Sequence, residues 1–490
     1  MDKKMLINGG SEHPRLCHFV IPIQSVCSDG RSKQIFLKMQ RKFCVLRKNA
    51  YLCTLIKRNV NKKMNKYGLT ALLACAFAAN ALAQSATNSP YSQYGLGVLA
   101  DQSQGTSRGM NGLGIGLRSD KIVNSLNPAS YSATDSLTML FDVGLAGQLT
   151  NYRENGASKN ATSANFEYAA AAFRVANGVG MSLGLVPYSN IGYKYYTNEY
   201  VGGLKSTYNT ETHKGEGGLH EVYLGIGARL FGGLSVGVNG GFLWGNYSRS
   251  IVNSSSVSSD NTLSRYYTAS INNYKLDFGL QYEQPLGKKD ALTIGLTYGF
   301  GHKLGADAQC QTISYNSSTS VSDTTTVVSE NALRIPHTFG VGFTYRHANR
   351  MTIGADYQLQ KWGSVTVDGS DERGVGNDWG HFKDRHKITL GGEFVPNEDS
   401  RSFLKQMHYR AGVSYTTPYL IINGANGPRE IAASVGVGIP IVNRYNNRSI
   451  VNVSAQWVNS SASGLVTENM FRINVGITFN ERWFMKWKFD

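Results

Sequence analysis

The amino-acid sequence predicts an all-β fold, a transmembrane antiparallel β-barrel of about 14 strands with an N-terminal lumenal hatch. The 490 residues include 54 glycines, 27 tyrosines and 20 phenylalanines, but only 17% are charged, against roughly 25% in an ordinary soluble domain. Short segments alternate apolar with small or polar residues, which is the period of a strand with two different faces. Tight turns between these segments alternate with long polar connections, as in outer-membrane barrels.

The strand pattern begins near residue 136. In one clear hairpin, Val222, Leu224 and Ile226 alternate with Glu221, Tyr223 and Gly225, and a glycine turn leads into the next strand. We expect strands near residues 136–152, 164–176, 178–198, 219–230, 234–250, 266–284, 290–304, 333–347, 350–361, 384–396, 407–417, 429–440, 448–458 and 468–479. An even number allows closure, which removes the free sheet edges that hydrocarbon would penalise. Residues 201–218, 251–265, 305–332 and 362–383 are expected to be long outside loops.

The barrel is predicted to span residues 136–479. Its last strand alternates without a fault from Phe471 to Phe479 and ends on an aromatic residue, which looks like the terminal signal that barrel-insertion machinery reads. Residues 480–490 place four aromatic residues among basic ones. They are too few for another pair of spanning strands, so we expect a periplasmic aromatic and basic tail.

The excess positive charge lies before the predicted barrel. The formal net charge is +16, but residues 1–63 contain 14 Lys or Arg and 3 Asp or Glu, and Lys66 adds one more charge, which leaves +4 for residues 84–490. A nucleic-acid partner is therefore not expected. The mean hydropathy of -0.26 does not exclude a barrel, since only alternate strand residues contact lipid.

Residues 64–83 have the pattern of a secretion signal. A charged start at Lys66 precedes a short apolar stretch, and Ala81-Leu-Ala83 precedes Gln84. We expect cleavage near Ala83/Gln84; the apolar stretch is too short for a transmembrane anchor. Residues 1–63 are then expected to be a mis-called upstream extension. Of six cysteines only Cys310 follows the cleavage site, so no internal disulfide is expected.

Residues 84–135 lack a strand pattern and are rich in glycine, serine and asparagine. They contain Tyr91-Ser-Gln-Tyr94-Gly95-Leu-Gly97 and the motif Asn127-Pro128-Ala129, which is followed by Ser-Tyr. About fifty residues before the first strand are enough to plug a barrel of this size. We therefore expect an N-terminal hatch.

A plug with an Asn-Pro-Ala motif before fourteen strands resembles the FadL-type outer-membrane transporters of hydrophobic compounds, and most closely their Bacteroidota branch. The resemblance covers the whole predicted mature chain. It implies a kinked third strand with a lateral gap beside the hatch. Pro187 lies within the third predicted strand, where a proline removes a ladder donor. The lateral-gate candidates are Gly184, Pro187, Asn190 and Gly192. The inward positions show no distinct apolar pocket.

Other constellations have simpler explanations. Gly112-Leu-Gly114-Ile-Gly116 lacks the preceding strand and the spacing of a phosphate loop. His381 and His386 lack a third ligand at a supporting spacing, and His220-Glu221 and His302 are what the ends of ordinary strands contain. We therefore expect no enzyme activity, no metal and no cofactor.

The leading hypothesis is a channel in the outer membrane of a Gram-negative bacterium for passive uptake of hydrophobic, fatty-acid-like small molecules. Hatch movement near Asn127-Pro128-Ala129 would open a path, and exit would be lateral at Pro187. The expected partners are outer-membrane lipid, the hydrophobic ligand and, during biogenesis, the barrel-insertion machinery. The alternative is a non-transporting barrel that acts as a scaffold or partner in protein secretion or outer-membrane assembly.

Overall fold

The computed structural model describes residues 5–6, 87–136, 138–201, 207–257, 259–306, 308–329, 333–348, 350–365, 381–422, 424–442 and 448–482. The barrel belongs to one compact unit, residues 1–7 and 84–490. The predicted signal peptide lies outside the described residues, as does the upstream extension apart from the two-residue strand β1 (Met5–Leu6).

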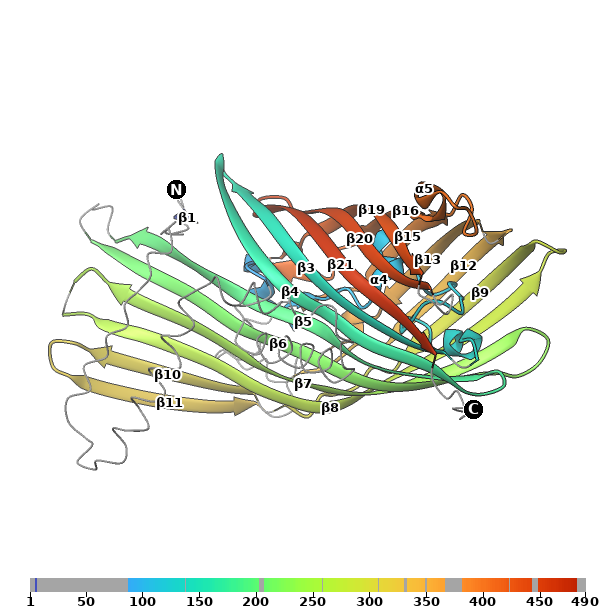
Figure 1. Cartoon of the computed structure of the whole chain (residues 1–490). Helices are drawn as coiled ribbons and strands as arrows, with labels where there is room; N and C mark the ends of the chain where they lie inside the picture. Colours follow the sequence, from blue (N-terminus) through green and yellow to red (C-terminus); the bar gives the residue numbers. More distant parts are fainter. Residues whose placement is uncertain are drawn as a thin grey trace, which may run out of the picture. The chain divides into compact units, whose positions relative to one another are not determined.

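Fourteen antiparallel strands close into a barrel, as the sequence predicts (Figure 1). They are β3 (Thr138–Glu154), β4 (Ala157–Ala176), β5 (Val179–Tyr200), β6 (Tyr208–Arg229), β7 (Leu234–Ser255), β8 (Asn261–Pro285), β9 (Asp290–Gly299), β12 (Thr338–His347), β13 (Met351–Gln360), β15 (Arg385–Phe394), β16 (His408–Thr416), β19 (Arg429–Val442), β20 (Arg448–Ser461) and β21 (Thr467–Arg482). The last strand pairs with the first from Thr467↔Arg153 to Arg482↔Thr138. This pairing closes the barrel and leaves neither β3 nor β21 with a free edge.

The barrel is apolar outside and polar inside. Exposed apolar side chains alternate along the strands, for example Val222, Leu224 and Ile226 on β6 and Phe471, Ile473 and Val475 on β21. The buried inward positions are polar, such as Ser182, Glu221, Ser235, Gln281, Thr293 and Asn474. A soluble protein has the opposite arrangement, so this pattern identifies the outer surface as the one that contacts lipid.

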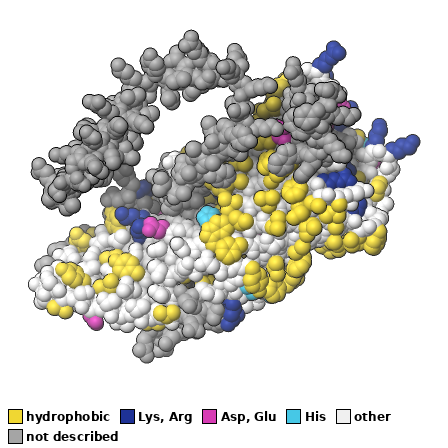
Figure 2. Space-filling model, turned by 60° about the horizontal axis from the view of Figure 1, so that its bottom comes forward, with side chains coloured by type: hydrophobic (Ala, Val, Ile, Leu, Met, Phe, Trp, Pro, Cys, Tyr) yellow, Lys and Arg dark blue, Asp and Glu magenta, His cyan; other side chains and the backbone are white. Residues whose placement is uncertain are grey.

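The strands extend well beyond this apolar zone at one end. β5, β6, β7 and β8 contain 22 to 25 residues, whereas a transmembrane strand needs about 9–11. In Figure 2 hydrophobic side chains gather over the right half of the molecule, and the left half is mostly polar and uncharged. The long half is therefore the extracellular wall.

Three expected outside loops are largely strand, which corrects the sequence prediction. β6 occupies residues 208–218 of the first expected loop, and β7 and β8 occupy residues 251–255 and 261–265 of the second. Residues 305–332 contain a hairpin of β10 (Ala308–Asn316) and β11 (Val321–Ser329), and β10 pairs with β8. Their serine and threonine residues suit a sheet that is solvated on one face. Because these strands have few apolar residues, the sequence pattern predicted loops in their place.

Smaller elements cover the two ends. On the extracellular side, η3 (Trp362–Ser364) lies beside a small sheet of β14 (His381–Phe382), β17 (Leu420–Ile422) and β18 (Ala425–Asn426). On the periplasmic side, α5 (Phe403–Gln406) lies in the turn between β15 and β16. β21 continues to Arg482, three residues beyond the predicted end, and the rest of the predicted tail is outside the described residues. No helix among the described residues is long and apolar enough to cross a membrane.

Residues 87–135, the predicted hatch, have little regular structure. They contain η1 (Pro90–Gln93), β2 (Val98–Leu99), α4 (Gly105–Gly109) and η2 (Pro128–Ala133). Most of their side chains are buried, and they contact inward-facing groups of β5 to β9 and β16 to β21. We call these residues the N-terminal segment.

Candidate functional site

The motif Asn127-Pro128-Ala129, together with Tyr131 of η2 and Ile115, lies on a floor of glycines. Five consecutive strands each contribute one inward glycine to this floor, namely Gly180 on β5, Gly227 on β6, Gly237 on β7, Gly279 on β8 and Gly295 on β9. A β-carbon added to Gly227 would lie 2.3 Å from the Pro128 carbonyl oxygen, and one added to Gly237 would lie 2.4 Å from the Pro128 carbonyl carbon. The bare inward face of these strands therefore has a specific purpose: it lets the backbone of η2 approach the wall.

Asn127 fixes the motif by its side chain, which is fully buried. Its amide nitrogen donates to the carbonyl oxygens of Ile115 at 2.9 Å and Leu280 at 3.2 Å. Its amide oxygen accepts from the backbone nitrogen of Ala129 at 3.1 Å, which caps η2. These bonds join two parts of the N-terminal segment to the barrel wall at one residue.

The barrel wall opens between β4 and β5. The ladder between these strands runs from Ala176↔Val179 to Ala169↔Leu185, and no pairing between them is found among the described residues beyond that point. β4 continues against β3 to Ala157, and β5 continues against β6 to Tyr200. In Figure 1 the β3–β4 hairpin and the wall of β5 to β8 diverge here. We call this opening the seam.

A β-bulge lies on each side of the seam, next to the last β4–β5 pair. Glu167 is the extra residue on β4, opposite the register shift at Gly144/Leu145 of β3. Tyr188 is the extra residue on β5, directly after Pro187, which pairs with His220 of β6. Bulges bend a strand and interrupt its pairing. Together with the missing amide hydrogen of Pro187 they explain why the ladder stops at this level.

The four lateral-gate candidates share one strand but not one role. Gly184 lies below the seam, and its missing side chain makes room for the ring of Tyr223. Pro187 marks the level at which pairing ends. Asn190 and Gly192 lie above it, on the edge of β5 that faces the seam. The structure therefore brings three of the four to the opening.

The first part of the N-terminal segment lies along the seam. Val98 and Leu99, which form β2, pair antiparallel with Asn190 and Ser189 of β5. The side-chain amide of Gln102 donates to the Pro187 carbonyl oxygen at 2.9 Å. We call residues 87–108 the strap. On this side of the seam, it serves as an added strand on the free edge of β5.

The strap also binds the opposite side of the seam. Arg108 forms an ion pair with the bulged Glu167 of β4, with 2.6 Å between Nη1 and Oε2, and both side chains are buried. The guanidinium lies over the ring of Tyr168, 5.7 Å from its centre. Arg108 Nε also donates to the Ser103 carbonyl oxygen at 3.0 Å. The strap thus connects the two strands that the barrel leaves unpaired.

Asp101 adds charge to this region of the strap. Burial would by itself raise the pKa of this carboxyl, but the neighbouring charges of Arg108 and Lys387 outweigh it and hold the pKa well below its usual value. Ser103 contributes by donating its backbone nitrogen to the carboxylate at 2.9 Å. Asp101 is therefore ionised at neutral pH.

A lumenal cavity of about 310 Å³ lies against the strap. Its lining includes Leu99 and Gln102 of the strap and Tyr188 and Asn190 of β5. Further around the barrel it meets apolar and charged side chains alike, among them Phe300, Tyr419, Leu420, Asp277, Arg385, Lys387, Glu430 and Arg472. The cavity is therefore amphipathic.

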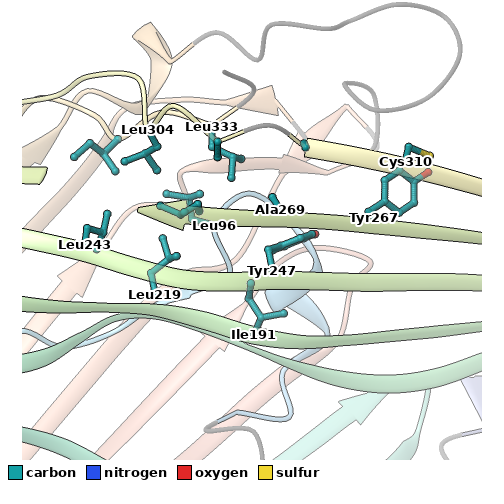
Figure 3. Close-up of a cluster of buried hydrophobic side chains, with 14 of the residues drawn as sticks. Leu96, Ile191, Leu219, Leu243, Tyr247, Tyr267, Ala269, Leu304, Cys310 and Leu333 are labelled. Carbon is teal, nitrogen blue, oxygen red and sulfur yellow. The ribbon is translucent and has the colours of Figure 1, made fainter. Parts of the chain in front are cut away.

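An apolar cluster, which shares Ile335 with the lining of the cavity, lies buried on the lumenal side of β5 to β8 (Figure 3). Leu96 of the strap packs among inward side chains of β5 to β8 and of the segments that follow β9 and precede β12. The cluster includes Ile191, Leu219, Leu243, Tyr247, Ile271, Leu304 and Leu333. The sequence did not reveal it, because each strand contributes only one to three apolar residues at inward positions.

Sequence reasoning also missed Gln102, Arg108 and Glu167. A signal was present for two of them. Glu167 precedes an alanine-rich stretch, and Arg108 lies in a segment of glycine and serine. A lone charge that is to be buried needs an opposite one, but nothing in the sequence pairs these two residues across 59 positions.

Comparison with protein families identifies the chain. A family model described as BamG matches residues 64–490. The chain belongs to the BamG family. No curated protein sequence is similar enough to this member of the family to count as a match.

Solved structures show that this BamG-family chain has the fold of FadL-type transporters, as the sequence resemblance implied. It superposes on the Ralstonia pickettii toluene transporter TbuX with a TM-score of 0.53 and 13% identity, covering 78% of this chain and 99% of that one. The P. putida toluene transporter TodX superposes with a TM-score of 0.54 and 14% identity, covering 79% of this chain and 100% of that one. A Pseudomonas aeruginosa FadL homologue superposes with a TM-score of 0.53 and 11% identity, covering 78% of this chain and 98% of that one. At such identities the likeness concerns the fold alone.

Proposed function

We propose that this protein is an outer-membrane channel for passive uptake of hydrophobic or amphipathic small molecules, which leave the lumen sideways through the seam. One observation supports the proposal most strongly. Leu99 and Gln102 line the lumenal cavity and also bind the β5 edge of the seam. Displacing the strap would therefore join the cavity to the membrane-facing opening.

The lining of the cavity supports an amphipathic solute. Its volume of about 310 Å³ falls at the lower end of ligand pockets, roughly 300–1,000 Å³. Tyr188, Phe300 and Tyr419 offer apolar contact, while Arg385 and Lys387 can pair with an acidic group. A fatty-acid-like compound has both properties. The solved structures that share the fold include two toluene transporters.

The glycine floor supports a fixed position for Asn127-Pro128-Ala129. Moving this motif would break the bonds of Asn127 and open empty space against the glycines of β6, β7 and β8. We therefore propose that residues 84–135 act as a hatch whose motif is the anchor and whose strap is the moving part. This differs from the expectation of movement at the motif itself. No source of energy is invoked, so flux follows the concentration gradient.

Uptake by intact cells tests this function. Cells that lack the protein are compared with complemented cells for uptake of labelled toluene and of a labelled long-chain fatty acid at low external concentration. We expect uptake of at least one compound to fall several-fold without the protein. If cells with and without the protein take up each of the two compounds at the same rate, the proposal is contradicted.

Membership of the BamG family supports a second candidate, a partner in outer-membrane assembly. The extracellular wall of β5 to β8 and the β10–β11 hairpin offer a long sheet for such contacts. Gentle solubilisation and pulldown separate the candidates. A scaffold should retain partner proteins in fixed stoichiometry, while a channel that acts alone should not.

A further inference from the structure

We propose that the periplasmic turn between β15 and β16 binds an anionic phospholipid of the inner leaflet. This binding is independent of solute passage. The turn contains five consecutive exposed residues, from Arg401 to Lys405. The two at α5 are large and apolar, since Phe403 is 54% and Leu404 is 63% exposed. Figure 1 shows α5 at the end of the barrel opposite the β10–β11 hairpin.

Tyr409 places α5 on the lipid-facing side of the barrel. Along β16, Arg410 points into the lumen, where it binds Asn452 at 2.6 Å, and its neighbour Tyr409 points outward and is exposed. The hydroxyl of Tyr409 donates to the carbonyl oxygen of Leu404 at 3.0 Å. Tyrosines of this kind lie at the boundary between hydrocarbon and water. The apolar pair of α5 is therefore held at the inner interface.

Polar contacts fix the turn without covering this pair. The backbone nitrogen of Asn397 donates to the Lys405 carbonyl oxygen at 2.8 Å. Glu398 accepts from Lys121 of the N-terminal segment at 2.9 Å. In water, a rigid turn that leaves Phe403 and Leu404 uncovered would gain nothing from them. Against acyl chains, both residues become stabilising.

Charge favours an acidic lipid. Arg401 and Lys405 flank the apolar pair, both are exposed, and neither side chain makes an ion pair with a described residue closer than 4.0 Å. Two acids lie nearby. Glu398 is already paired with Lys121, and the second acid, Asp399, still leaves one positive charge in excess beside the apolar pair. Lysine and arginine beside an apolar surface are the pattern that binds anionic headgroups.

Two other periplasmic turns repeat the pattern. Exposed Leu230 and Phe231 follow Arg229 in the turn after β6, and exposed Leu286 precedes Lys288 in the turn after β8. Each apolar patch is far smaller than a specific protein interface, which buries about 1,200–2,000 Å². Lipid is therefore the occupant that fits. The β15–β16 turn, where two exposed apolar residues lie between two exposed basic ones, is its main site.

Lipid titration of the intact purified protein tests the charge requirement. Wild-type protein in detergent is titrated with phosphatidylglycerol and phosphatidylcholine, and bound lipid is counted by native mass spectrometry. The variant Arg401→Gln/Lys405→Gln should bind phosphatidylglycerol about tenfold more weakly. The control Lys194→Gln/Arg265→Gln removes two exposed charges from the extracellular wall and should bind as wild type does. Equal affinity of wild type for both lipids, or an unchanged Arg401→Gln/Lys405→Gln variant, would overturn the proposal.

A spin label tests the position of α5. In a Cys310→Ala background, Leu404→Cys is labelled and the protein is placed in phosphatidylglycerol vesicles. We expect the label to be accessible to oxygen, which partitions into membrane, and shielded from a water-soluble nickel chelate. A label at Val328→Cys on β11 should show the reverse. A label at residue 404 that the nickel chelate reaches freely would refute membrane contact.

Discussion

Arg108 of the N-terminal segment and Glu167 of β4 form a buried ion pair with 2.6 Å between their charged atoms. Glu167 is the bulged residue beside which the β4–β5 ladder stops. The same segment binds Pro187 on the other strand through Gln102. A chain that lies inside the barrel therefore closes the one interruption in its described wall, and these two contacts, with the β2–β5 pairing, hold it there.

Arg108→Gln should loosen the strap. It leaves the Glu167 carboxylate buried without its partner, which costs about 3–5 kcal/mol when the charge cannot reach water. We expect faster hydrogen exchange in residues 94–108, with the rest of the barrel unchanged. Hydrogen–deuterium exchange by mass spectrometry in lipid vesicles measures this.

Two further variants check the cause. Glu167→Gln combined with Arg108→Gln should restore part of the protection, because no charge is then stranded. Lys214→Gln breaks an exposed pair with Glu216, and such pairs contribute roughly 0–1 kcal/mol. Exchange in the strap that rises equally in Lys214→Gln would show that the effect is not specific to the buried pair.

Gly237→Val should displace the Asn127-Pro128-Ala129 motif. The added β-carbon alone would lie 2.4 Å from the carbonyl carbon of Pro128, and overpacking of this kind costs about 1–3 kcal/mol. Urea unfolding in vesicles should show the loss of stability. The control Gly240→Val lies on the same strand, but the nearest atom to its β-carbon is 4.0 Å away. The account of the glycine floor fails if both variants unfold at the same urea concentration.

Pro187→Val should slow uptake. Valine supplies the missing amide hydrogen and favours a regular strand, so β5 can continue its pairing with β4 and narrow the seam. Initial uptake rates of the transported compound are compared with those of Pro440→Val, which alters a proline in the uninterrupted β19–β20 ladder. Unchanged uptake in Pro187→Val, or an equal loss in both variants, would remove Pro187 from the exit path.

The sequence predicted the barrel because the alternation that marks a lipid-facing strand lies within each strand. Apolar residues such as Val222 and Leu224 alternate with inward ones, and lipid exposure needs no partner strand to be read from the sequence. All fourteen strands were therefore found near their observed positions. The extracellular extensions were missed because residues such as those of β11 are polar on both faces, and pairing, not burial, holds them in the sheet.

The candidate site was predicted only in part. Pro187 indicated an interruption in the strand ladder, because proline has no backbone amide hydrogen to donate. Asn127-Pro128-Ala129 was recognisable as a motif. The glycine floor, the strap and the ion pair of Arg108 with Glu167 join residues far apart in the chain. Such contacts follow from how the segment enters the lumen, which no periodicity encodes.

Locking the strap to β5 tests the central claim most directly. Leu99 and Ser189 are antiparallel partners, at a separation of about 4.5–5.5 Å that suits a disulfide, so Leu99→Cys/Ser189→Cys in a Cys310→Ala background should form one. The measurement is uptake of the labelled compound before and after reduction. We predict that oxidised protein transports at no more than about a tenth of the reduced rate, and that reductant restores it. Equal uptake in the oxidised and reduced states would contradict lateral exit through the seam.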